Sequence, residues 1–179
     1  MKITIFGLAG SGKSTVGKLL TDKLNYTFMS SGNIMRQWAE AEGLSIYDFE
    51  DKIAKNDDTF DVKLDNKVRE YGVENDNFLF ESRLAWYFIP DSFKIYLKCD
   101  EETRYKRIQN REATPLQDII DKNKKRETEL EQRYAKIYPH ISFPPREEVF
   151  DIVIDVANIS PQEIVDIIVS KIGVKYMEF

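Results

Sequence analysis

Residues 7–14 read Gly7-Leu8-Ala9-Gly10-Ser11-Gly12-Lys13-Ser14, and they directly follow the apolar run Ile3-Thr4-Ile5-Phe6. The spacing G-x-x-x-x-G-K-[ST] is typical of a phosphate-binding loop, which needs a strand before it and a helix N-terminus after it. The apolar run predicts the strand over residues 2–6, and the helical spacing of apolar residues predicts the helix over residues 13–24. The pattern therefore predicts binding of a nucleoside triphosphate.

The residue types in this loop each suit a bound phosphate. Glycines allow a sharp turn that points successive backbone N–H groups at anionic oxygens. Lys13 would bring a compact positive charge to the β- and γ-phosphates. The Ser14 hydroxyl is a hard oxygen ligand of the kind that Mg²⁺ prefers. We therefore expect ATP and Mg²⁺ as cofactors.

Composition and charge narrow the class of protein. The chain has 179 residues, which fits one domain, and its net charge of −5 argues against a nucleic-acid partner, because proteins that bind the phosphate backbone are usually basic. Cys99 is the single cysteine, so an intrachain disulfide is excluded. No apolar run reaches the roughly 18 residues that span a bilayer, and no basic leader precedes the first strand. We expect a cytoplasmic protein without a membrane partner.

The rest of the chain alternates strands with helices. Strands are expected at residues 26–29, 78–80, 93–97 and 152–154, and helices at residues 33–42, 60–71, 101–111 and 115–138. Three capping patterns predict helix starts: Ser45 with Asp48, Thr114 with Gln117, and Ser160 with Glu163. Strands that alternate with helices favour an α/β fold in which helices cover both faces of a parallel sheet.

Phosphate loops also occur in GTPase switches, but the strings Asn-Lys-x-Asp and Asp-x-x-Gly of that class are missing from the sequence. Arginines stand instead where a phosphotransferase needs them, because Arg36 and Arg83 follow the second and third strands. The carboxyl ends of parallel strands face the ligand crevice, and a guanidinium fork suits a phosphate monoester. Glu81, at the end of the third strand, is placed to hold Mg²⁺ through water, or else is a surface carboxylate.

A second group of arginines lies later in the chain. Arg104, Arg107 and Arg111 recur at spacings of three and four residues, which places them on one helix face, and Arg126 and Arg133 lie on the next helix. Two such helices predict a lid that closes over the triphosphate and excludes water. We assign this role to Arg107 and Arg111 before Arg104. The alternative interpretation is a solvated, charged helix face.

With these residues in place, the chain resembles the nucleoside monophosphate kinase family, in particular the small archaeal-type cytidylate kinases and their adenylate kinase relatives. The resemblance covers nearly the whole chain and rests on five blocks: Gly7–Thr15, Ser31-Gly32 with Arg36, Phe78–Arg83, Arg107 with Arg111, and Arg126–Tyr134. It implies one P-loop kinase domain, residues 1–179, with a five-stranded parallel sheet of order 2-3-1-4-5. Residues 30–73 would form a helical monophosphate-binding segment and residues 101–138 a helical lid.

The resemblance also implies roles for individual residues. Gly7–Thr15 would bind ATP, and Ser14 and Glu81 would bind Mg²⁺. The monophosphate would be held by Ser31, Gly32, Arg36, Arg83 and Arg126, and the transferring phosphoryl group by Lys13, Arg83, Arg107 and Arg111. The implied reaction is ATP-dependent phosphorylation of CMP or dCMP by a monomer, with a nucleoside monophosphate as its small-molecule partner.

Two departures from the family pattern bear on the acceptor. Ser82 stands where these relatives commonly have glycine, and Asp61 and Asp65 lack the arginines expected near them, so these carboxylates either contact ribose or base or are solvated. The acceptor therefore stays open: an adenylate kinase-like enzyme or a kinase for another small metabolite is an alternative. A nucleotide-dependent binding or assembly factor is the alternative outside the enzymes.

Overall fold

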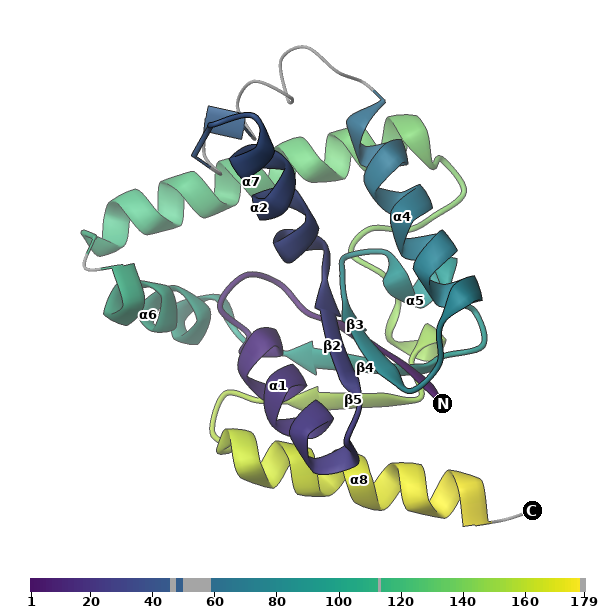
Figure 1. The fold of residues 1–179 in the computed structure, drawn as a ribbon. Coiled ribbons are helices and arrows are strands. Elements are labelled where there is room, and N and C mark those ends of the chain that lie inside the picture. The colour runs from purple at the N-terminus through teal and green to yellow at the C-terminus, as the bar shows by residue number, and fades with distance from the viewer. Residues whose placement is uncertain (46–47, 50–58, 113, 178–179) are drawn as a thin grey trace. The chain divides into compact units, whose positions relative to one another are not determined.

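The structure is a computed structural model that describes residues 1–45, 48–49, 59–112 and 114–177 (Figure 1). The chain divides into two compact units. Met1–Phe6 and Gly17–Lys94 form the first unit, and Gly7–Val16 and Ile95–Phe179 form the second. The phosphate loop and the arginines of residues 104–133 therefore belong to the second unit, whereas Arg36 and Arg83 belong to the first.

The sheet has five strands in the order β2-β3-β1-β4-β5, which confirms the predicted topology. The strands are β1 (Lys2–Phe6), β2 (Thr27–Ser30), β3 (Phe78–Glu81), β4 (Phe93–Lys98) and β5 (Ile152–Asp155). β3 pairs in parallel with both β1 and β2, and β5 pairs in parallel with β4. The residues Phe78–Phe80 are fully buried, as expected of a strand with both faces covered.

In the first unit, helices pack on β1, β2 and β3. These are α1 (Lys13–Leu24, from Gly17 onward), α2 (Ser31–Ala41), α4 (Phe60–Glu74) and the short α5 (Ala85–Phe88). A Cβ atom built on Gly17 would lie 2.6 Å from the ring of Phe28, so glycine lets α1 approach the sheet closely. Between α2 and α4, Trp38 and Phe60 meet edge to face with ring centroids 5.5 Å apart. This packing ties the segment after β2 to the helix that precedes β3.

In the second unit, α6 (Glu101–Glu112) and α7 (Leu116–Ile137) form a helix pair, and η1 (Glu147–Val149) and α8 (Pro161–Met177) flank β5 in sequence (Figure 1). Tyr105 and Ile108 of α6 and Ile119 of α7 form a buried apolar cluster, against which Ala9 of the phosphate loop packs. The described helices include none that is both long and apolar enough to cross a membrane.

Two of the three predicted capping patterns are present. The Ser160 hydroxyl oxygen accepts from the backbone N–H of Glu163 at 3.3 Å, and the Glu163 carboxylate accepts from the N–H of Ser160 at 3.0 Å. The Ser45 hydroxyl oxygen likewise accepts from the N–H of Asp48 at 3.1 Å. The helix predicted after Ser45 falls partly on residues 46–47 and 50–58, which lie outside the described residues.

The third pattern, at Thr114, is wrong. α7 begins at Leu116 with Pro115 in the capping position, and no side chain caps it. The Thr114 hydroxyl instead donates to the carbonyl of Glu112, at the end of the preceding helix, at 3.3 Å. The Thr114 hydroxyl is thus bonded to the end of α6, and no side chain in the described part of the chain accepts from the first N–H groups of α7.

The start of α2 also differs from the prediction. Ser30 adopts the extended conformation of a capping residue, with φ −147° and ψ 144°, and its hydroxyl oxygen accepts from the N–H of Asn33 at 3.0 Å. The helix therefore begins at Ser31 rather than at residue 33, and Ser31 and Gly32 lie in its first turn. Smaller shifts of one to three residues occur at the ends of β2, β4 and α4.

Ser160, which caps a helix, and Thr114, which does not, give a paired prediction about the stability of the protein. Ser160→Ala should lower the free energy of unfolding by about 1 kcal/mol, because it removes a formed helix cap. Thr114→Ala should change it by less than about 0.5 kcal/mol, because no cap is lost. Urea unfolding of both variants and the parent measures the difference, and equal losses would contradict the cap assignment.

Candidate active site

The phosphate loop connects β1 to α1, as its pattern predicts. Gly10 and Gly12 have φ angles of +82° and +90°, in the region that glycine enters without strain. The carbonyl of Leu8 accepts from the N–H of Ser11 at 3.2 Å and from the Lys13 ammonium at 3.0 Å. The loop thus closes on the Leu8 carbonyl with the Lys13 charge held over it, directly before the N-terminus of α1.

Observations in the loop fit a bound phosphate chain. A Cβ atom built on Gly12 would meet no other atom within 4 Å, so the space beside this glycine is open. Ser11 is buried, and its hydroxyl has no hydrogen-bond partner among the described residues. The first backbone N–H groups of a helix have no partner within the helix and carry partial positive charge. The loop therefore presents donors and positive charge beside an open space.

Arg104 packs directly against this loop. Its side chain is 2% exposed, and its Nη1 donates to the carbonyl of Ala9 at 3.0 Å and to Oε1 of Glu127 at 2.9 Å. A Cβ atom on Gly10 would lie 2.4 Å from the Arg104 carbonyl oxygen. The sequence grouped Arg104 with the lid arginines, whereas the structure makes it part of the support beneath the loop.

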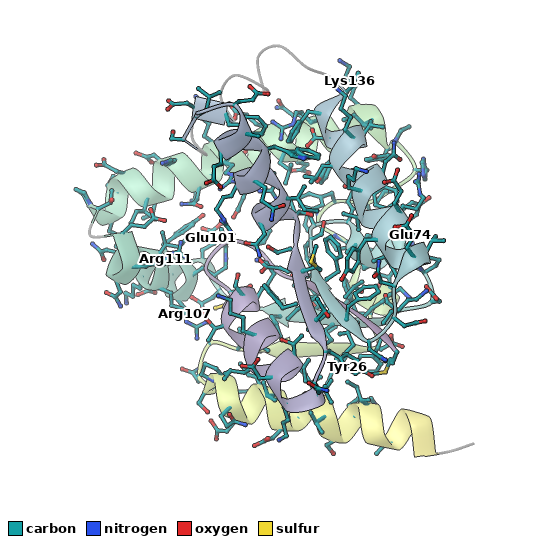
Figure 2. The ribbon with its side chains drawn as sticks, viewed as in Figure 1. Tyr26, Glu74, Glu101, Arg107, Arg111 and Lys136 are labelled. Atoms are coloured by element: carbon teal, nitrogen blue, oxygen red, sulfur yellow. The ribbon has the colours of Figure 1, made fainter. Side chains whose placement is uncertain are left out.

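Arg107 and Arg111 also project from α6, but their surroundings differ (Figure 2). Arg107 donates through Nη2 to the carbonyls of Val156 and Ala157 at 2.7 and 3.3 Å, in the segment after β5. Arg111 lies in the last turn of α6 with its side chain 69% exposed, and it pairs with Glu112 at 3.0 Å. The three arginines of α6 therefore do not form one cluster, and the proposed roles of Arg107 and Arg111 stay predictions. Arg126 lies exposed on α7.

The thiol beside Arg107 is not activated for nucleophilic chemistry. Burial raises the pKa of Cys99, and the positive charge of Arg107 opposes that shift. The net effect is a raised pKa, so the thiol is protonated at neutral pH.

In the first unit, three predicted acceptor residues lie at the start of α2. The terminal nitrogens of Arg36 lie 3.7 Å from a Cβ atom built on Gly32, so its guanidinium lies over the first turn of the helix. Its Nη2 donates to the side-chain oxygen of Asn33. The Ser31 hydroxyl is buried and has no hydrogen-bond partner among the described residues. The first turn of α2 thus carries a buried hydroxyl and has a guanidinium over Gly32, and these groups at a helix N-terminus fit a phosphate.

Glu81 and Arg83 lie close to this group in the same unit. Glu81, the last residue of β3, pairs in register with Ser30 of β2 and Ile5 of β1. Arg83 follows two residues later, and its carbonyl accepts from Nε1 of Trp86 at 3.0 Å, which holds the turn after β3. The register of β2 and β3 thus starts the segments that carry Ser31 and Arg83 side by side, and the shared role of these residues stays a prediction.

Two carboxylates on α4 differ in burial. Asp65 is only 3% exposed, so the solvated interpretation is wrong for it, while Asp61 is partly exposed. Among the described residues, no group of three or more His, Cys, Asp or Glu side chains is placed to hold a metal ion. Ser14 and Glu81 remain the residues predicted for Mg²⁺, with phosphate oxygens as the other ligands.

Known proteins match this chain over most of its length. The AAA domain family matches residues 3–133. A cytidylate kinase of Methanobrevibacter smithii is 32% identical over 174 residues, which cover 97% of this chain and 99% of the relative. A cytidylate kinase of Haloarcula marismortui is 35% identical over 169 residues, which cover 93% of this chain and 86% of the relative. The chain belongs to the nucleoside monophosphate kinase family.

This kinase also shares its fold with solved structures. A shikimate kinase from Aquifex aeolicus superposes with a TM-score of 0.60 at 22% sequence identity, with 99% of both chains covered. At that identity the likeness concerns the fold alone.

Sequence reasoning underrated two residues of this kinase. Ser30 caps α2. The sequence has two serines at this point, Ser30 and Ser31, and the predicted site included only Ser31. Arg104 supports the phosphate loop. The signal for its burial is that Tyr105 and Ile108, the apolar residues of α6 that face the core, lie close to it in the sequence. Spacing alone could not separate Arg104 from Arg107, because both fall on one side of the helix.

Proposed function

We propose that the kinase transfers the γ-phosphoryl group of ATP to CMP or dCMP, giving ADP and the nucleoside diphosphate. The observation that carries this proposal is the match to relatives named cytidylate kinase, at 31–35% identity and over most of both chains. Two groups of residues fit its two substrates: the phosphate loop suits the donor, and the group at the start of α2 suits the acceptor.

On the donor side, the residues Gly7–Thr15 would hold the triphosphate through backbone N–H groups, with Lys13 against the β- and γ-phosphates. The hydroxyl of Ser14 and, through water, the carboxylate of Glu81 would hold Mg²⁺. When bound, Mg²⁺ supplies positive charge to the phosphate oxygens. Residues 101–138 would act as the lid that excludes water.

On the acceptor side, Ser31, Gly32 and Arg36 would bind the monophosphate together with Arg83 and Arg126. Two observations support this assignment: the Arg36 guanidinium lies near Gly32, and the buried Ser31 hydroxyl has no hydrogen-bond partner within the described ranges. Residues 30–73 would form the segment that holds the acceptor. The buried Asp65 on α4 lies within that segment and is a candidate for contact with ribose or base.

The transfer needs no general base, because the attacking acceptor oxygen is already anionic. That oxygen forms a bond to the γ-phosphorus, the bond from the γ-phosphorus to the β–γ bridging oxygen breaks, and the electron pair leaves with ADP. The protein contributes position and positive charge, which are what phosphoryl transfer requires. Lys13, Arg83, Arg107 and Arg111 would neutralise the charge on the transferring group.

The proposal predicts that ADP release from Mg²⁺-ATP is strongly stimulated by CMP or dCMP. A coupled assay with CMP, dCMP, UMP, AMP and GMP offered separately measures it. Preference for AMP would replace the acceptor but keep the enzyme class. Bound ATP with no stimulation by any monophosphate would contradict the proposal and favour a non-nucleotide acceptor or a binding role.

A further inference from the structure

The second unit contains a buried cation that touches the phosphate loop. Arg104 on α6 is 1% exposed, although arginine is rarely buried to this degree unless it is paired. One of its nitrogens, Nη1, donates both to the carbonyl of Ala9 and to the carboxylate of Glu127, at 3.0 and 2.9 Å. A single nitrogen atom thus links the phosphate loop to α7.

The bond to Ala9 fixes the direction of a peptide plane. In a trans peptide the carbonyl and the following N–H point in opposite directions. Because the carbonyl of Ala9 points at the Arg104 guanidinium, the N–H of Gly10 points away from that guanidinium. Gly10 lies in the loop whose backbone N–H groups are expected to bind phosphate, so this bond decides where one of those donors points.

Further contacts restrict the same peptide. The Cα of Gly10 lies against the backbone of Arg104, so closely that a Cβ atom would come within 2.4 Å of its carbonyl oxygen. The side chain of Ala9 packs on the apolar cluster of Tyr105, Ile108 and Ile119. α6 therefore contacts this peptide through a charged hydrogen bond, a backbone contact and an apolar contact.

Glu127 holds the guanidinium in place. A buried charge is costly unless an opposite charge and hydrogen bonds compensate it, and the Glu127 carboxylate supplies the charge from α7. The Nε of Arg104 has no hydrogen-bond partner among the described residues. The hydrogen bonds that hold the guanidinium are therefore the two that Nη1 makes, and the ring of Tyr105 lies beside it with its centroid 5.1 Å from Cζ.

We propose that Arg104 is a positioning residue for the donor nucleotide, and that Glu127 sets its position from α7. Arg104 orients the Ala9–Gly10 peptide so that the N–H of Gly10 is available to a phosphate oxygen. A change in α7 that weakens the Glu127 bond reduces the affinity of the loop for triphosphate. This inference rests on the proposed function only for the use of the loop to bind a triphosphate chain.

The test measures binding of Mg²⁺-tripolyphosphate by calorimetry, which requires no acceptor. Arg104→Met removes both bonds and should raise the dissociation constant about tenfold or more, because small displacements of positioned groups have large effects. Arg104→Lys keeps the charge and should restore part of the affinity. Glu127→Gln should raise the dissociation constant by a smaller factor. The KM for the monophosphate should stay within about twofold in all three variants, since the hydrogen bonds of the Arg104 side chain within the described part of the chain go to Ala9 and Glu127.

The control is Lys106→Gln, which removes an exposed cation and its 2.6 Å ion pair with Glu102 from the same helix. This variant should bind tripolyphosphate as the parent does.

A merely structural role for Arg104 would lower the melting temperature and leave the dissociation constant of the folded protein unchanged, and that result overturns the proposal. If Arg104→Met does not fold, Arg104→Lys decides by the same criterion, with a dissociation constant equal to that of the parent as the overturning result. Failure of every monophosphate as an acceptor would refute the proposed function without altering these binding results.

Discussion

Replacement of Arg83 by methionine is expected to lower kcat for CMP phosphorylation by about 10³-fold or more, the range seen when a transition-state arginine is lost. Arg83 follows Glu81 at the carboxyl end of β3, and the bond from Trp86 to its carbonyl holds the turn that carries it. Its guanidinium is predicted both to hold the acceptor phosphate and to neutralise the transferring group. Methionine keeps an unbranched, flexible side chain but removes the charge and the donors.

Arg69→Met is the matched control for this substitution. Arg69 is an exposed arginine of α4 in the same unit, with its guanidinium 4.8 Å from the ring centroid of Phe88. It lies in the predicted acceptor segment but is not among the residues predicted to bind the acceptor phosphate or the transferring group. Steady-state assays with ATP and CMP should show near-parental turnover for Arg69→Met. An Arg83→Met enzyme with near-normal kcat would refute the role of Arg83, whereas a rise in KM alone would restrict that role to binding.

The strands of the sheet could be predicted because the signals for them are local, whereas the strand order came from the resemblance to the kinase family. The phosphate loop fixes a strand before it and a helix after it, and Phe78–Phe80 is an unbroken apolar run that only a doubly covered strand explains. The start of a helix was predicted correctly where two residues cap it together, as Ser160 and Glu163 do by each accepting from the backbone N–H of the other.

One failure arose from a competing local bond, and two arose where tertiary contacts determine the outcome. Thr114 has the sequence of a cap, but its hydroxyl bonds to the previous helix. Asp65 is a charge on a helix rich in charges, but its side chain is buried. Arg104 shares its helix spacing with Arg107, and only the fold shows that one lies beneath the phosphate loop and the other contacts the segment after β5. Burial depends on neighbours that are distant in sequence, so spacing could not supply it.

The two glycines with positive φ in the phosphate loop should respond differently to alanine. Both substitutions strain the backbone, by roughly 1–2 kcal/mol. At Gly10 the new Cβ would also press on the Arg104 carbonyl oxygen at 2.4 Å, an overpacking cost of about 1–3 kcal/mol, because a helix backbone cannot move aside cheaply. At Gly12 the new Cβ would enter open space. Gly10→Ala should therefore lower the free energy of unfolding by about 2–5 kcal/mol and Gly12→Ala by only about 1–2 kcal/mol.

Nucleotide binding should be the property that a larger side chain at Gly12 changes most. The open space beside Gly12 is where the proposed triphosphate would lie, so bulk added there excludes the ligand rather than damaging the fold. Gly12→Val should raise the dissociation constant for Mg²⁺-ATP by about 100-fold or more, because it displaces phosphate from its N–H donors. Urea unfolding and calorimetric titration on Gly10→Ala, Gly12→Ala and Gly12→Val measure both quantities. ATP binding by Gly12→Val at parental affinity would contradict the assignment of the loop to phosphate. A larger loss of stability at Gly12 than at Gly10 would contradict the support of the loop by α6.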